Sequence, residues 1–119
     1  MTVQRGEVVL VDYPYSDRTG SKVRPALVVQ ADLYNRQLAD TILALITGSK
    51  HRIVGAANQL VIDITTSDGK QTGLRHSSLV QCENLVTLDQ GLILRTLGNF
   101  SSSLMKQIDA CLRASLGLP

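Results

Sequence analysis

The chain has 119 residues, enough for one ordinary domain whose core needs no disulfide or metal to hold it together. We therefore expect a single domain over residues 1–119. The formal net charge is only +2, which excludes a polycationic surface that coats nucleic acid indiscriminately.

Composition also bears on location and cofactors. The two cysteines show neither metal-ligand clustering nor an extracellular disulfide pattern, and no charged-then-apolar leader opens the chain. No apolar run approaches the roughly 18 residues of a membrane span. We expect a cytoplasmic protein that binds no membrane, metal or cofactor.

Short apolar runs bounded by turn-forming residues predict five or six strands. Their ranges are 7–12, 26–30, 41–47, 60–65, 78–82 and, as a strand or the start of a helix, 91–97. A chain with this many short strands is expected to form a small barrel or a strongly bent sheet.

Helices are predicted at two places. Residues 31–40 have room for a short helix with Asp32 as a possible cap, and the serines before Leu104 can cap a C-terminal helix. One face of this C-terminal helix suits core or dimer packing and comprises Leu104, Ile108, Cys111, Leu112 and Ser115. Between the strands, Asp68-Gly69 predicts a hairpin turn.

The segment KVRPALVVQ, residues 22–30, contains the most informative local pattern. Pro25 cannot donate a ladder hydrogen bond and disfavours a helical backbone at Arg24, so a loop is expected to become a strand here. A guanidinium held at such a point is well suited to grip a phosphate. From the residues alone, Arg24 could equally fix a turn by binding carbonyls or Asp17.

Positive charge is concentrated around this segment. The cations between residues 16 and 52 are Arg18, Lys22, Arg24, Arg36, Lys50 and Arg52, against the anions Asp17, Asp32 and Asp40. Lys50, His51 and Arg52 form a basic triplet in a glycine-flanked loop, which could follow an RNA backbone or simply be solvated. Arg75 and His76 precede a strand and could face a partner or only solvent.

The combination of Arg5-Gly6, Val23-Arg24-Pro25 and Ile46-Thr47, with GLRHSSLVQCENLVTLDQ later in the chain, resembles the MazF/PemK family of bacterial toxins over nearly the full length. That resemblance implies a mainly antiparallel, SH3-like and CcdB-like barrel with a C-terminal helix and one or two helices in all. It also implies a symmetric homodimer, a cognate antitoxin, and metal-independent cleavage of single-stranded RNA by the ribose 2′-hydroxyl.

The resemblance assigns Arg24 and Thr47 as the catalytic residues, since charge accumulates on the scissile phosphate and both can donate to it. On its own, Thr47 is an ordinary strand residue. Glu83 matches an acidic position of some members, but their arginine two residues earlier is Gln81 here. The residues expected to bind substrate are Tyr15, Lys22, Ser49, Lys50, His51, Arg52, Arg75 and Glu83.

Two other functions remain open from the sequence. A related toxin class with this fold poisons DNA gyrase by binding it, and fold alone does not separate the two activities. A member that keeps the fold and the antitoxin contact but has little activity is the other alternative, given Gln81.

Overall fold

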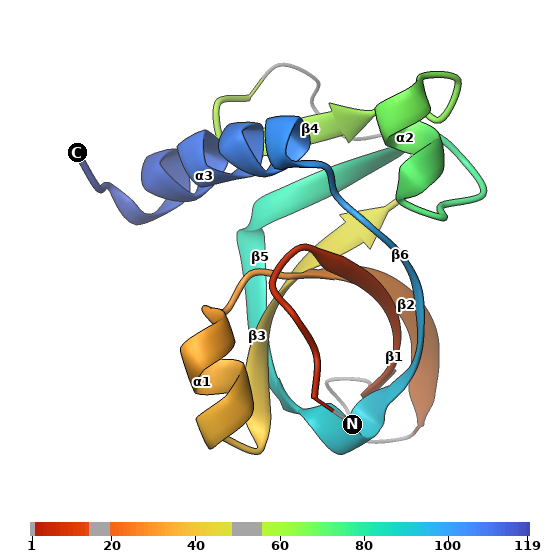
Figure 1. The fold of residues 1–119 in the computed structure, drawn as a ribbon, viewed down its shortest axis with the longest axis vertical. Coiled ribbons are helices and arrows are strands. Elements are labelled where there is room, and N and C mark those ends of the chain that lie inside the picture. The colour runs from red at the N-terminus through yellow and green to blue at the C-terminus, as the bar shows by residue number, and fades with distance from the viewer. Residues whose placement is uncertain (1, 15–19, 49–55) are drawn as a thin grey trace.

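The computed structural model describes residues 2–14, 20–48 and 56–119. Its strands form one sheet in the order β4-β5-β3-β2-β1-β6, with every neighbouring pair antiparallel. They are β1 (Glu7–Pro14), β2 (Ser21–Val28), β3 (Asp40–Thr47), β4 (Gln59–Ile62), β5 (Ser78–Asp89) and β6 (Ile93–Asn99). The sheet curls into a barrel-like ring in Figure 1, which confirms the mainly β fold.

The helices lie outside this ring (Figure 1). The longest, α3 (Ser102–Leu116), packs against β4 and β5, while α1 (Asp32–Gln37) lies beside β3 (Figure 1). The Ser101 hydroxyl accepts the Leu104 N–H at the start of α3, and Gly117 ends it at φ 68°. The predicted capped C-terminal helix is therefore confirmed, and its buried stripe contains Leu104, Ile108 and Cys111.

The hairpin turn expected at Asp68-Gly69 is wrong, because both residues lie in a third helix, α2 (Ser67–Gln71). Thr66 caps this helix by accepting the Gly69 N–H at 2.9 Å. A Cβ added to Gly69 would lie 1.9 Å from the Asp63 carbonyl oxygen. The glycine therefore permits close packing of the helix rather than a tight turn.

Asp32 was also wrongly expected to cap α1. The N-cap is Ala31, without a side-chain hydrogen bond, and Asp32 is the first residue of the helix. The Asp32 carboxylate instead accepts the Arg5 backbone N–H at 2.6 Å. This long-range contact fixes the helix start to the N-terminal segment.

Several predicted strand limits change for one reason, which is pairing with distant strands. β2 starts at Ser21 rather than 26 because β1 pairs with it throughout. β5 runs on to Asp89 rather than ending at 82 because its bulge around Cys82–Asn84 realigns it with β3. β4 ends at Ile62, and a short 3-10 turn, η1 (Gln90–Leu92), precedes β6.

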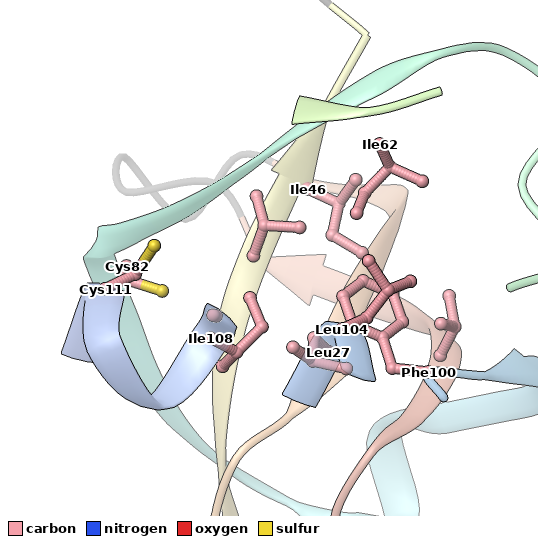
Figure 2. Close-up of a cluster of buried hydrophobic side chains, with 11 residues drawn as sticks. Leu27, Ile46, Ile62, Cys82, Phe100, Leu104, Ile108 and Cys111 are labelled. Atoms are coloured by element: carbon pink, nitrogen blue, oxygen red, sulfur yellow. The ribbon is translucent and has the colours of Figure 1, made fainter. Parts of the chain in front are cut away.

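Two hydrophobic cores lie on the two faces of the sheet. The helix-side core packs under α3 and is drawn in Figure 2; it includes Leu27, Ile46, Ile62, Cys82, Phe100, Leu104, Ile108 and Cys111. The barrel core comprises Val3, Val9, Val11, Ala26, Val28, Leu43, Leu45 and Ile93. Alternate residues of β2 and β3 thus enter opposite cores, as the period of a strand requires.

Arg5 connects the N-terminal segment to α3. Its Nε donates to the Val29 carbonyl at 2.9 Å, and its Nη2 lies 2.7 Å from the Asp109 carboxylate. Both side chains are about one-third exposed, so this ion pair contributes no more than about 1 kcal/mol. Arg5, one of the residues in the family pattern, therefore has a structural role in joining the N-terminal segment to α3.

Candidate active site

Arg24 and Thr47 lie on the neighbouring strands β2 and β3. The paired residues of these strands run from Val28↔Leu43 to Ala26↔Leu45. Continuing that register by two residues sets Arg24 opposite Thr47. Both residues are partly exposed.

The two side chains also share a face of the sheet. Arg24 follows Val28 and Ala26 in strand alternation, and Thr47 follows Leu43 and Leu45, all of which enter the barrel core. The cross-strand partner of Arg24 in β1 is Val11, another barrel-core residue. Strand alternation therefore directs both side chains to the barrel-core face, just beyond the last pair of β2 and β3.

β2 and β3 separate at this rim. β2 stays paired with β1 to Ser21, and β3 stays paired with β5 to Thr47, but the pairing between β2 and β3 stops at Ala26↔Leu45. The next residue of β2, Pro25, has no N–H to donate. We call this divergence the fork.

The fork corrects the expectation that Arg24-Pro25 marks a change from loop to strand. Both residues lie inside β2, and Pro25 marks the point at which β2 leaves β3. Arg24 therefore lies on one arm of the fork and Thr47 at the end of the other.

Arg24 is available to a ligand as far as the described residues show. The one ion pair among them joins Arg5 to Asp109, and no hydrogen bond links the Arg24 guanidinium to another described residue. A guanidinium and a hydroxyl on facing strands can together donate to the oxygens of one phosphate.

A cavity of about 630 Å³ borders the fork, and we call it the basic pocket. Its lining includes Pro25 and Gly48, the chain neighbours of Arg24 and Thr47. Because Pro25 alternates with Arg24, the basic pocket lies on the opposite face of β2 from the guanidinium. Three of its lining residues are exposed and carry nitrogen groups, namely the cations Arg75 and Arg95 and the imidazole of His76.

Comparison with known proteins decides the family. The family described as "PemK-like, MazF-like toxin of type II toxin-antitoxin system" matches residues 4–116. The chain belongs to this family. Similar relatives include endoribonuclease MazF2 of Mycobacterium bovis and endoribonuclease MazF6 of Mycobacterium tuberculosis, each 30% identical over 119 residues, covering 99% of this chain and 100% of the relative.

Solved MazF structures share the fold. An endoribonuclease in complex with its cognate antitoxin, from a mycobacterial species, superposes with a TM-score of 0.78 at 26% identity, covering 98% of this chain and 97% of that one. MazE–MazF from Deinococcus radiodurans gives 0.75 at 17% identity, with 100% of both chains covered. At that identity the second comparison supports the fold alone.

The other residues expected to bind substrate are spread over this MazF-like fold. Lys22 is exposed on β2, two residues before Arg24 and opposite Tyr13. Arg75 lines the basic pocket. Residues Tyr15, Ser49, Lys50, His51 and Arg52 lie outside the described part of the chain.

Glu83 lies apart from the fork. It sits in the bulge of β5, four residues beyond Leu79, the partner of Thr47, which is roughly 13 Å along a strand. Its carboxylate accepts a hydrogen bond from Gln59 Nε2 at 2.7 Å. Arg24 and Thr47 lie near the ends of two neighbouring strands, whereas Glu83 lies farther along β5.

Gln81, which replaces the arginine of some family members, is 6% exposed. It is the cross-strand partner of both Leu45 in β3 and Gln59 in β4. The neutral amide therefore occupies a buried position in the middle of the sheet, where a cation would have to be removed from water.

Arg95 lines the basic pocket, and the sequence did not point to it. It lies on β6 as the partner of Leu10, which also pairs with Pro25, so Pro25, Leu10 and Arg95 form a row across three strands. A single arginine in the run GLILRTL carries no local signal. Only the pairing of β1 with β6, remote in sequence, brings it to the basic pocket.

The two cysteines lie away from the fork, in the helix-side core. Figure 2 shows their sulfur atoms next to each other, one from β5 and one from α3. Burial raises the pKa of the Cys82 thiol to about 12, and burial also raises the pKa of Cys111. Both thiols therefore remain protonated near neutral pH and are poor nucleophiles.

The described residues offer no cluster of metal-ligating side chains. Within them, no three His, Cys, Asp or Glu side chains gather closely enough to hold a metal ion. None of their helices is long and apolar enough to cross a membrane.

Proposed function

We propose that this chain is the toxin of a type II toxin-antitoxin pair and a sequence-specific, metal-independent endoribonuclease that cleaves single-stranded mRNA. The observation that supports the proposal is the fork, because Arg24 and Thr47 lie on neighbouring strands and alternate onto the same face of the sheet. The family and the endoribonuclease relatives support it independently.

In the proposed reaction, the ribose 2′-oxygen attacks the adjacent phosphorus. The bond from phosphorus to the 5′-oxygen breaks, leaving a 2′,3′-cyclic phosphate on one product. The proton lost from the 2′-hydroxyl is balanced by one gained at the 5′-oxygen of the other. Negative charge grows on the non-bridging oxygens, where Arg24 donates hydrogen bonds and Thr47 helps to hold the phosphate.

The proposed partners follow from the same family. We expect a cognate antitoxin to lay an extended, acidic and apolar segment over the positive side of the fork, and the toxin to act in the cytoplasm. We also expect a symmetric homodimer. Large apolar side chains exposed on the single chain, including Val61, Leu94 and Leu116, are available for such contacts.

The test is incubation of the purified protein with a long unstructured RNA in excess EDTA, followed by mapping of both new ends. We expect discrete cuts with cyclic phosphate and 5′-hydroxyl ends, since no step uses a metal ion. RNA that stays intact, with or without magnesium, would exclude the nuclease. If DNA gyrase were stalled by the same preparation, the gyrase-poison alternative would replace it.

A further inference from the structure

Cys82 and Cys111 form a pair of thiols in the helix-side core, and the proposed cleavage does not use them. They are the only cysteines of the chain, yet they come from different elements, Cys82 from β5 and Cys111 from α3. Their sulfur atoms lie next to each other in Figure 2, and the two thiols share a hydrogen bond. Thiols in such contact can be joined by a disulfide without a large movement of the backbone.

Each thiol is carried by a well-anchored part of the backbone. The Cys82 N–H donates to the Asn58 carbonyl at 3.1 Å, at the start of the β5 bulge. Cys111 follows the fully buried Ile108 in α3 and lies two residues after Asp109, the partner of Arg5. The sheet and the helix therefore hold the two sulfur atoms near each other, which favours a reaction between them over a reaction with another molecule.

The two thiols are not equivalent, and Cys111 is the one that an oxidant reaches first. Cys111 is 6% exposed, whereas Cys82 is 0% exposed. Burial raises the pKa of Cys111, but the hydrogen bond that Cys82 donates to it lowers that pKa in part. Burial raises the pKa of Cys82 to about 12, so Cys82 keeps its proton and is the less reactive thiol. Cys111 is therefore the thiol to react with the oxidant, and Cys82 the thiol to react with Cys111 afterwards.

We propose that the Cys82–Cys111 pair is an oxidative modification site, at which hydrogen peroxide converts the two thiols into a disulfide between β5 and α3. The Cys111 sulfur attacks one peroxide oxygen, the O–O bond breaks, and a sulfenic acid and one water molecule result. The Cys82 sulfur then attacks the Cys111 sulfur, the S–O bond breaks, and a second water molecule leaves. The thiols lose two electrons and two hydrogen atoms, and the peroxide is reduced to water.

The disulfide ties α3 to the sheet. It closes a loop of roughly 30 residues, which contains the end of β5, η1, β6 and the start of α3. Such a loop restricts the unfolded chain and raises the melting temperature. The pair lies in the helix-side core, whereas Arg24 and Thr47 alternate onto the barrel-core face. In a reducing compartment the two residues stay as thiols, and the bridge forms only during exposure to an oxidant.

The experiment treats the purified full chain with hydrogen peroxide, blocks the remaining thiols with iodoacetamide after denaturation, and maps the tryptic peptides without reduction. Trypsin places Cys82 in peptide 76–95 and Cys111 in peptide 107–113, neither of which contains a methionine. We expect these two peptides joined in one species that dithiothreitol separates. The oxidised protein should melt roughly 10 °C above the reduced protein, and dithiothreitol should reverse the shift.

Cys82→Ala and Cys111→Ala are the matched controls. Each removes one sulfur from the helix-side core and costs some stability, but the melting temperature of neither should rise with peroxide. Met105, which peroxide can also oxidise, is present in all three proteins, so its effect is the same in each comparison. If either variant does not fold, the peptide map of the wild type alone decides whether the bridge forms.

The outcomes are distinct. Two alkylated thiols in the peroxide-treated wild type, or sulfinic and sulfonic acids in place of the joined peptides, would overturn the proposal. A bridge between two chains, seen as a doubled mass on a non-reducing gel, would also overturn it, because the proposed bond lies within one chain. RNA cleavage in EDTA, measured on the reduced protein, tests the nuclease separately, since the thiols take no part in the proposed reaction.

Discussion

At the residue scale, the side chains of Arg24 and Thr47 have complementary chemistry. Arg24 carries a permanent charge in a planar group, whereas Thr47 offers one neutral hydroxyl on the facing strand. Strand alternation keeps both on the barrel-core face. The resemblance to the family named these residues from the sequence, and their joint action stays a prediction.

Thr47→Val tests the hydroxyl alone, because valine keeps the β-branched shape and the strand preference of threonine. We expect cleavage in EDTA to slow by roughly 10- to 100-fold, the value of a hydrogen bond to a charged group. Thr47→Ser keeps a hydroxyl and should retain most of the activity. Equal rates for the valine and serine variants would show that the hydroxyl does not contact the phosphate.

At the element scale, α2 and the segment after it pack closely against the backbone of β6. Gly73 has φ +75°, and Gly98 approaches the Gln71 carbonyl oxygen so closely that an added Cβ would lie 2.4 Å from it. Neither contact has a signature in the local sequence, and the same holds for the close packing of Gly69 on Asp63, which Asp68-Gly69 alone does not reveal. The C-terminal helix was predictable because its cap and its apolar stripe are both local.

Gly73→Ala should lower the free energy of unfolding by about 2–4 kcal/mol, because alanine is strained at positive φ and its Cβ would clash with the Leu97 carbonyl. Chemical denaturation measures the change. Gly48→Ala is the matched control, since nothing lies within 4 Å of its added Cβ. If both variants were equally stable, the close contact between Gly73 and the Leu97 carbonyl would not constrain the segment after α2.

At the scale of the whole molecule, one curled sheet separates two hydrophobic cores. The helix-side core holds α3 on one face, and the barrel core fills the other, with the fork at its rim. The strands and their alternation were largely predictable from apolar runs. The bulge of β5, the long β2 and the position of Arg95 were not, because they depend on pairing between distant segments.

The expected homodimer is a prediction at this scale. Leu94 and Leu116 are 55% and 56% exposed on the single chain, and burial of such side chains between two copies would remove them from water. Light scattering on the purified protein should give about twice the 12.9 kDa mass of one chain. A preparation that cleaves RNA fully while having the mass of one chain would show that the active unit is a monomer.

The most direct test of the account is the cleavage rate of Arg24→Ala, measured in EDTA on one mapped RNA. Its melting temperature should match that of the wild type, because no described residue pairs with the guanidinium. We predict a loss of at least about 100-fold, as expected for removing a preorganised donor to the developing charge. A folded Arg24→Ala protein that cuts the same RNA at the wild-type rate would contradict the assignment of the fork as the active site.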